Sequence, residues 1–217
     1  MNHEPKDEHM RELAQQLRCP DGEAGIHTGE NMHINNAHMI EITIQSLSLA
    51  DGDHVLEIGP GNGHHVPKLF TIVPNLEYTG IDISETMVQE ARRFNAPDRI
   101  TFDITDGQTI PFPDHSFDKI FTINTIYFWE NPAAYCEEIY RCLKPGGTFH
   151  LTFVLKEFME HLPFTQYGFV LYSNDASIDL LKNAAFSIQE VHQETEEITS
   201  NTSTPVHRTF ALIIAKK

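Results

Sequence analysis

Basic side chains are scarce in this 217-residue chain, where 15 lysines and arginines face 31 aspartates and glutamates, for a formal net charge of −16. Nucleic-acid binding depends largely on lysine and arginine contacts to phosphates, so we expect no nucleic-acid partner. Cysteine is also scarce, and an odd set of three predicts structural thiols in a reducing, cytoplasmic compartment. Cys19, which precedes Pro20 in an expected loop, is the thiol that we would test for reactivity.

Long apolar runs are absent as well. No stretch approaches the roughly 18 consecutive apolar residues of a membrane span, and the first 18 residues are too polar for a secretory signal. Metal-ligand patterns are missing too: Cys136 and Cys142 lie six residues apart on an expected helix, and His64 and His65 are neighbours that should face different ways. We therefore expect no membrane span and no metal site.

The remaining sequence alternates between strand and helix patterns. Strands are predicted at 55–58, 76–83, 99–105, 117–124, 148–154, 187–195 and 206–215, and helices at 1–18, 35–49, 64–73, 85–94, 133–143 and 173–186. The alternation predicts a parallel sheet with helices on both faces. No helix separates the last two strands, so the final strand should run antiparallel. Residues 19–33 are predicted as a loop, and 156–172 fit no single class.

The main sequence motif is a glycine-rich turn. In VLEIGPGNG (55–63), a buried strand leads through Gly59, Gly61 and Gly63 into a helix, which is typical of a nucleotide-like ligand site. Glu57 lies inside the apolar strand and needs a partner, such as a cation or hydroxyl of a ligand. The glycine spacing departs from G-x-G-x-x-G and so disfavours a nicotinamide oxidoreductase. A tight turn without a ligand is the alternative.

Acidic residues follow the next two strands. Asp82 ends the second strand, where ligands bind in such sheets, and could accept from ribose hydroxyls or complement a helix dipole. Asp106 and Gly107 follow the third strand, where a carboxylate could accept from an exocyclic amino group or form an ordinary turn.

Four motifs together carry a family resemblance: VLEIGPGNG, Asp82 after GI, DGQTIPFPDHSFD and RCLKPGG. The stretch 53–154 resembles class I S-adenosylmethionine-dependent methyltransferases, in the small-molecule branch related to quinone and sterol methyltransferases. The resemblance implies an α/β fold, a Rossmann-like, doubly wound, mostly parallel seven-stranded sheet with an antiparallel C-terminal strand. It also implies an N-terminal arm or lid at 1–36 and a single methyltransferase domain at 37–217.

The resemblance implies S-adenosyl-L-methionine as the cofactor and gives roles to individual residues. The glycine backbone and Glu57 would approach the methionine part, Asp82 the ribose, and Asp106 the adenine amine. The full implied set is Glu57, Gly59, Gly61, Gly63, Asp82, Ile83, Met87, Asp106, Gly107, Asn124 and Thr125. Residues 17–36 resemble a segment that covers the cofactor and would bring Met32, Asn35 or Asn36 to the site, or they form a mobile arm.

The methyl acceptor is less readable. The segment after the fourth strand reads NTIYFW (124–129), without the paired prolines of many nucleic-acid and protein amino methyltransferases, and 156–172 is short. We therefore expect a small-molecule acceptor. Met32, Tyr127 and Trp129 are candidates for its pocket, and Tyr127 or His33 for catalysis, with packing as the alternative for the aromatic residues. A non-catalytic cofactor-binding protein and a methyltransferase acting on a protein stay open, and the sequence predicts no oligomeric state.

Overall fold

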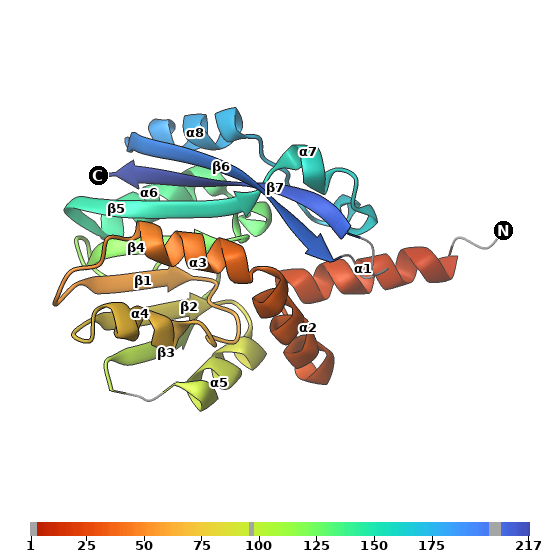
Figure 1. Cartoon of the computed structure of the whole chain (residues 1–217), viewed down its shortest axis with the longest axis horizontal. Helices are drawn as coiled ribbons and strands as arrows, with labels where there is room; N and C mark the ends of the chain where they lie inside the picture. The colour runs from red at the N-terminus through yellow and green to blue at the C-terminus, as the bar shows by residue number, and fades with distance from the viewer. Residues whose placement is uncertain (1–3, 96–97, 200–204) are drawn as a thin grey trace.

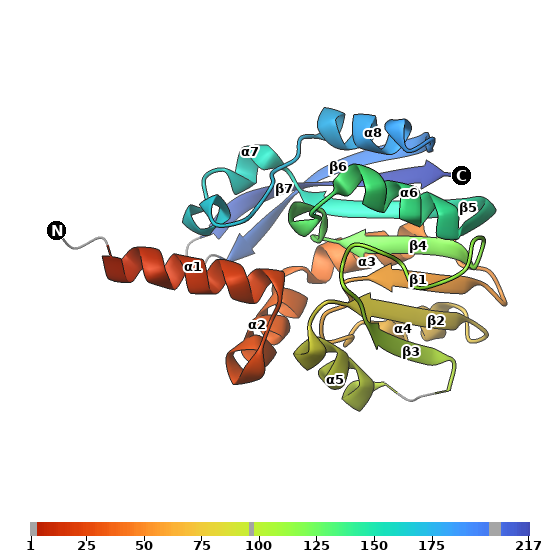
Figure 2. The same ribbon diagram turned by 180° about the vertical axis from the view of Figure 1, so that it is seen from behind.

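A seven-stranded sheet runs through the centre of the computed structural model, which describes residues 4–95, 98–199 and 205–217 (Figures 1 and 2). Within these residues the strand order is β3-β2-β1-β4-β5-β7-β6. The strands are β1 (His54–Ile58), β2 (Glu77–Asp82), β3 (Ile100–Ile104), β4 (Phe117–Ile123), β5 (Leu143–Val154), β6 (Ser187–Thr199) and β7 (Pro205–Lys216). β1 to β5 pair in parallel, and β7 pairs antiparallel with β5 and β6. The predicted fold class is confirmed.

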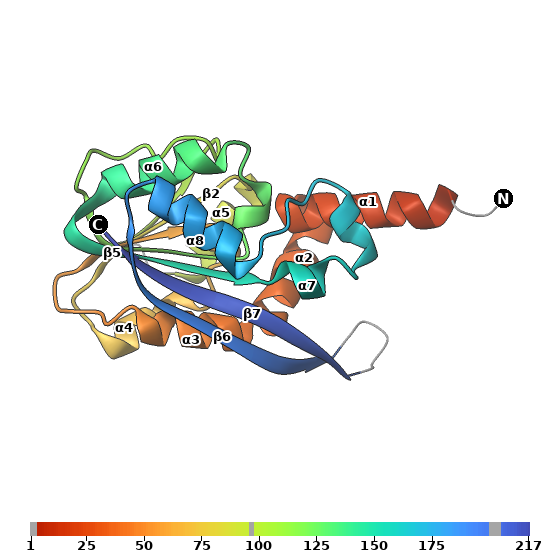
Figure 3. The same ribbon diagram turned by 90° about the horizontal axis from the view of Figure 1, so that it is seen from above.

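Helices cover both faces of the sheet, as Figure 3 shows from above. α3 (Ala37–Ser46) and α4 (Val66–Ile72) lie on one face, and α6 (Pro132–Cys142) and α8 (Asn174–Asn183) lie on the other. α5 (Glu85–Phe94) shares a buried apolar cluster with α3 and α4. Cys136 and Cys142 are buried in the opposite cluster, and the Cys142 thiol contacts the Phe112 carbonyl at 3.7 Å.

Local signals account for the helix boundaries. The Ser84 hydroxyl accepts from the Met87 N–H and caps α5, and the Ser173 hydroxyl accepts from the Ala176 N–H and caps α8. Pro67 lies in the first turn of α4, where its missing N–H has no helical partner to lose. The fifth strand begins earlier than predicted, at Leu143.

The predicted loop at 19–33 is wrong for residues 22–33. Residues 22–35 form α2 (Gly22–Asn35), which follows α1 (Glu4–Arg18) and crosses α5. A Cβ on Gly29 would lie 2.7 Å from the Met87 sulfur, and one on Gly25 would lie 2.6 Å from the Pro20 backbone. These glycines therefore serve close packing, whereas their number had suggested a loop.

The segment 156–172 contains two short helices, α7 (Lys156–Met159) and η2 (Pro163–Gln166). α1 packs against η2, and the Arg11 guanidinium lies 4.5 Å from the centre of the Tyr167 ring. The start of α1 extends away from the sheet (Figure 1). Residues 1–3 of the predicted first helix lie outside the described residues. No described helix is both long and apolar enough to cross a membrane.

Candidate functional site

A cavity lies over the carboxyl ends of β1, β2 and β4, and α2 forms part of its wall. The sheet, the loops that follow its strands, and the N-terminal helices all contribute to it. The predicted site residues that line it are Met32, His33, Glu57, Gly59, Gly61, Asp82, Ile83, Met87, Asp106, Gly107, Asn124, Thr125 and Trp129. Of the predicted set, Gly63 and Tyr127 are not among the lining residues. Asn36 also lines the cavity, whereas Asn35 does not.

The three glycines of the turn have different surroundings. All have positive φ angles: 73° at Gly59, 57° at Gly61 and 65° at Gly63. A Cβ on Gly59 would overlap Cγ2 of Thr125, and one on Gly63 would lie 3.0 Å from the Ala91 methyl. A Cβ on Gly61 would meet nothing within 4 Å. The backbone at Gly61 is therefore open to a ligand, whereas Gly59 and Gly63 permit close packing.

Glu57 has partners within the chain. Its side chain is buried on β1, and His65 Nε2 lies 3.0 and 2.9 Å from the two carboxylate oxygens. The Tyr78 hydroxyl donates to Oε2 at 2.5 Å. Burial and the adjacent Glu57 charge raise the pKa of Tyr78 well above its usual value, so the phenol stays protonated. The predicted need of Glu57 for a partner is therefore met within the chain, by His65 at the start of α4 and by Tyr78 on β2.

Asp82 ends β2 with its side chain buried beside the glycine turn. One carboxylate oxygen accepts from the Gly61 N–H at 3.1 Å, and the other accepts from the Ser84 N–H at 2.9 Å. Burial raises the pKa of Asp82 to about 6, against the lowering effect of these backbone donors. Asp82 thus joins the glycine turn to the start of α5 and holds an acceptor at the cavity wall.

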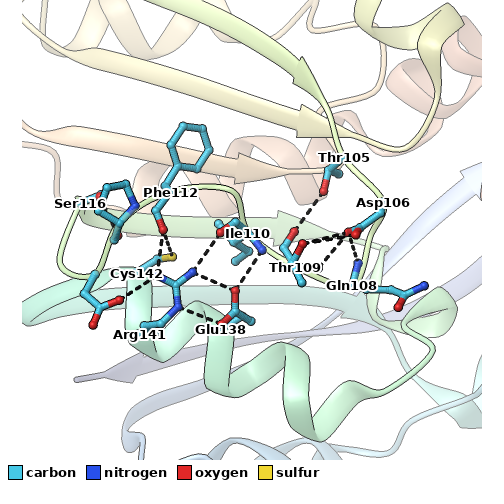
Figure 4. A network of polar contacts seen from close by, with 12 residues as sticks. Thr105, Asp106, Gln108, Thr109, Ile110, Phe112, Ser116, Glu138, Arg141 and Cys142 are labelled. Atoms are coloured by element: carbon cyan, nitrogen blue, oxygen red, sulfur yellow. Dashed lines mark hydrogen bonds and ion pairs between the residues drawn. The ribbon is translucent and has the colours of Figure 1, made fainter.

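Asp106 forms the turn that follows β3. Its Oδ1 accepts from the backbone N–H groups of Gln108 at 2.8 Å and Thr109 at 2.9 Å, as Figure 4 shows. These donors lower the pKa of this exposed carboxyl. Its Oδ2 contacts only the Thr109 hydroxyl, at 3.3 Å, among the described residues. The turn interpretation therefore holds, and the second oxygen keeps capacity for a further donor.

Arg141 on α6 clamps the loop that carries Asp106 (Figure 4). Its guanidinium donates to the carbonyls of Ile110 at 3.0 Å and Phe112 at 2.8 Å. It also donates to Glu138, whose carboxylate accepts from the Ile110 N–H at 3.1 Å. Sequence reasoning missed this clamp, because the loop has no periodicity and the partners lie about 30 residues apart.

Tyr127 anchors the end of the sheet. Its buried hydroxyl lies 2.6 Å from Val154 N, 2.9 Å from Val154 O and 3.0 Å from Asn124 Oδ1. Burial raises the pKa of this phenol far above its usual value. The interpretation of Tyr127 as a pocket wall or catalytic residue is therefore not supported, and the packing alternative accounts for it. Asn124, at a φ of 60°, turns the chain there.

Replacing Tyr127 with phenylalanine should lower the free energy of unfolding by about 1–3 kcal/mol, because the buried Val154 N–H keeps only the 3.2 Å contact to Asn124. Urea unfolding measures the change. Tyr140→Phe is the matched control, since no described residue bonds that hydroxyl, and it should cost little. Equal losses of unfolding free energy in Tyr127→Phe and Tyr140→Phe would contradict the role of the Tyr127 hydroxyl as a structural anchor.

A cluster of histidine rings borders the cavity. The His33 ring centre lies 5.4 Å from that of His64 and 6.3 Å from that of His65. Both neighbours therefore approach one ring, contrary to the expectation that they face apart. Among the described residues, no group of three or more His, Cys, Asp or Glu side chains could hold a metal ion. Burial, then His65 and His64, lowers the pKa of His33, which favours the neutral ring.

Two buried nitrogens beside the cavity lack partners among the described residues: Nδ1 of His33 and Nε1 of Trp129. Trp129 packs edge-to-face on Tyr135, with ring centres 5.0 Å apart. The Cys19 thiol contacts the Ile83 carbonyl at 3.8 Å, and burial and Asp82 raise its pKa, which disfavours the reactive thiolate.

Comparisons with known proteins agree with this geometry. The methyltransferase domain family matches residues 56–151. The chain is 30% identical over 129 residues to the uncharacterized methyltransferase YdaC of Bacillus subtilis (strain 168), covering 59% of this chain and 71% of that protein. It is 32% identical over 126 residues to a demethylmenaquinone methyltransferase of Symbiobacterium thermophilum, covering 56% of this chain and 49% of that protein.

A solved structure shares the fold. The S-adenosylmethionine-dependent methyltransferase of Mesorhizobium loti superposes with a TM-score of 0.65 at 18% identity, over 82% of this chain and 96% of that one. At that identity the likeness shows the fold alone. Apart from YdaC, the chain spans about half or less of the length of several curated relatives that it matches.

Proposed function

Because this chain belongs to the class I S-adenosylmethionine-dependent methyltransferases, we propose that its cavity binds S-adenosylmethionine and that a small-molecule acceptor receives the methyl group. The observation that carries the proposal is the pairing of the Asp82 carboxylate with the open backbone at Gly61, 3.1 Å apart at one cavity wall. An anionic acceptor and an uncovered turn are what a ribose and its attached chain require.

The adenosine half of the cofactor fits the groups after β2 and β3. Asp82 is proposed to accept from the ribose hydroxyls. Ile83 and Met87 offer apolar surface for the adenine, and Oδ2 of Asp106 has capacity for the adenine amine. A Cβ on Gly107 would lie 2.9 Å from the Ile83 side chain, so this turn is closely packed against the proposed adenine wall.

The methionine half is proposed to lie over the glycine turn, near Glu57, Asn124 and Thr125. Glu57 keeps its bonds to His65 and Tyr78 and contributes a negative field for the ammonium group. The cofactor supplies an activated methyl group on a sulfonium. The chain's part is then to align the acceptor and exclude water, and no strong base is required unless the acceptor must lose a proton.

Residues 1–36 are proposed to act as a lid over a single domain formed by 37–217. The Ser84 hydroxyl donates to the Pro20 carbonyl at 2.5 Å, and the Gly22 N–H donates to the Thr86 hydroxyl at 3.2 Å, so the link between α1 and α2 docks on α5. Met32 and His33 then line the cavity opposite the sheet. Together with Trp129 they are the proposed acceptor contacts, and His33 is the proposed proton acceptor.

A small-molecule acceptor is supported by the short segment between β5 and α8, which holds only α7 and η2 among the described residues. The test measures S-adenosylhomocysteine release with panels of hydroxyl, amine, thiol and activated-carbon acceptors. Turnover with one class is expected. A methylated protein in extracts without small-molecule turnover would favour a protein acceptor, and cofactor binding without any turnover would favour the non-catalytic alternative.

Cofactor affinity should depend on pH through Asp82. Its pKa is about 6 in the free protein, and hydroxyl donors favour the ionised carboxylate, so bound cofactor should lower this pKa. Above pH 6 the carboxylate is already ionised, and affinity should be flat. Below pH 6 a proton must first leave, so the S-adenosylhomocysteine Kd should rise about tenfold per pH unit. Calorimetry between pH 4.5 and 8 measures this. If the Kd of the Asp82→Asn variant rose equally steeply below pH 6, the pH dependence would belong to another titrating group.

A further inference from the structure

Arg208 is a buried cation far along the chain from the cavity. It lies on β7, and its side chain and that of Glu196, directly opposite on β6, are 8% and 10% exposed. Both Nε and Nη2 of Arg208 contact one Glu196 oxygen, at 3.0 and 2.6 Å. Glu196 therefore neutralises Arg208 but occupies only part of its hydrogen-bonding capacity.

The remaining donors of Arg208 reach the junction of α2 and α3. Nη2 donates to the carbonyl of Asn35 at 2.7 Å, and Nη1 donates to Oδ1 of Asn36 at 3.0 Å. Asn35 ends α2, where carbonyls lack helical partners and a cation is favourable. Asn36 precedes α3 without capping it, because its side-chain oxygen accepts from Arg208. Through Arg208, the hairpin of β6 and β7 is thus hydrogen-bonded to the junction of α2 and α3.

The junction of α2 and α3 forms part of the cavity wall. Asn36 lines the cavity, and Met32 and His33 line it from the last turn of α2. A second contact holds the same junction: His38 Nε2 lies 2.7 Å from a Glu194 oxygen, and its ring packs edge-to-face on Phe210. The other end of α2 is held by α5.

We propose that Arg208, held by Glu196, is a positioning residue that fixes the cavity-lining end of α2 for cofactor binding. This inference rests on the proposed function. Hydrophobic replacement of a buried ion pair can preserve stability, so a purely structural pair is replaceable by apolar side chains. A positioning role cannot be replaced in this way, because the planar guanidinium reaches Asn35, Asn36 and Glu196 from separate nitrogens held in one fixed geometry, whereas lysine has a single ammonium nitrogen.

The test uses the full chain with Arg208→Met combined with Glu196→Leu, and Arg208→Lys as a second variant. Each is compared with wild type in thermal unfolding, calorimetry with S-adenosylhomocysteine and hydrogen exchange of residues 22–36. Lys144→Met removes an ion pair with Asp118 and is the matched control. We expect both Arg208 variants to unfold near wild type, to raise the Kd at least tenfold and to exchange faster over 22–36.

A Kd within twofold of wild type in both Arg208 variants would overturn the inference, as would faster exchange of equal size in the control. If wild type itself fails to bind S-adenosylhomocysteine, the proposed function fails separately, and the exchange experiment alone decides the positioning role. Unchanged protection of 22–36 would then overturn it, and selective loss of that protection would support it.

Discussion

Replacing Asp82 with asparagine should weaken S-adenosylhomocysteine binding by about 100-fold. The carboxylate is buried and ionised near neutral pH, and hydrogen bonds to a charged acceptor contribute about 1.5–3 kcal/mol each. Asparagine keeps the shape but loses the charge, and it has one acceptor oxygen where Gly61 and Ser84 now use two. A loss of about 3 kcal/mol corresponds to that change in Kd.

Calorimetry measures the effect, with Asp103→Asn as the matched control. Asp103 lies on the neighbouring strand β3, pairs in register with Ile81, and has a half-exposed side chain near Arg92. Its replacement should leave the Kd within about twofold, since no cofactor contact is lost. Equal Kd values for wild type and Asp82→Asn would remove Asp82 from the proposed ribose contact.

Alanine at Gly59 should destabilise the fold by about 2–5 kcal/mol, more than alanine at Gly61. Both positions have positive φ, which costs about 1–2 kcal/mol for a side chain with a Cβ. At Gly59 the new methyl also overlaps Cγ2 of Thr125, and overpacking adds about 1–3 kcal/mol. At Gly61 the methyl meets open space, so the main loss there should be in cofactor binding.

Urea unfolding separates the two effects, and Thr125→Ser supplies the rescue. Serine removes Cγ2 and keeps the hydroxyl, which lies 2.5 Å from the Thr122 hydroxyl. Gly59→Ala combined with Thr125→Ser should therefore recover about 1–3 kcal/mol relative to Gly59→Ala. The packing explanation fails if Gly59→Ala is no more destabilising than Gly61→Ala, or if serine gives no recovery.

The sequence predicted features whose signals are local. Strand and helix alternation depends on neighbouring residues, and the structure confirms it. The caps at Ser84 and Ser173 and the place of Pro67 in a first turn are local in the same sense. The residues after the parallel strands were also placed together correctly, because the carboxyl ends of such strands meet at one edge of the sheet.

Features that depend on distant partners could not be predicted. Gly29 suggested a loop, but it allows α2 to approach Met87 on α5. Glu57 suggested a ligand, but His65 and Tyr78 come from two other elements. Arg208 reaches Asn36 across 172 residues, and no periodicity or motif marks that contact. In each case the decisive contact is tertiary, so a local pattern carries no information about it.

The most direct test of the central claim is calorimetric titration of the wild-type chain with S-adenosylhomocysteine. The Asp82 carboxylate, the open backbone at Gly61 and the cover formed by α2 together predict saturable binding of one molecule per chain. NAD should give no saturable binding under the same conditions. Absence of saturable heat with S-adenosylhomocysteine, or saturable binding of NAD in its place, would contradict the assignment of this cavity.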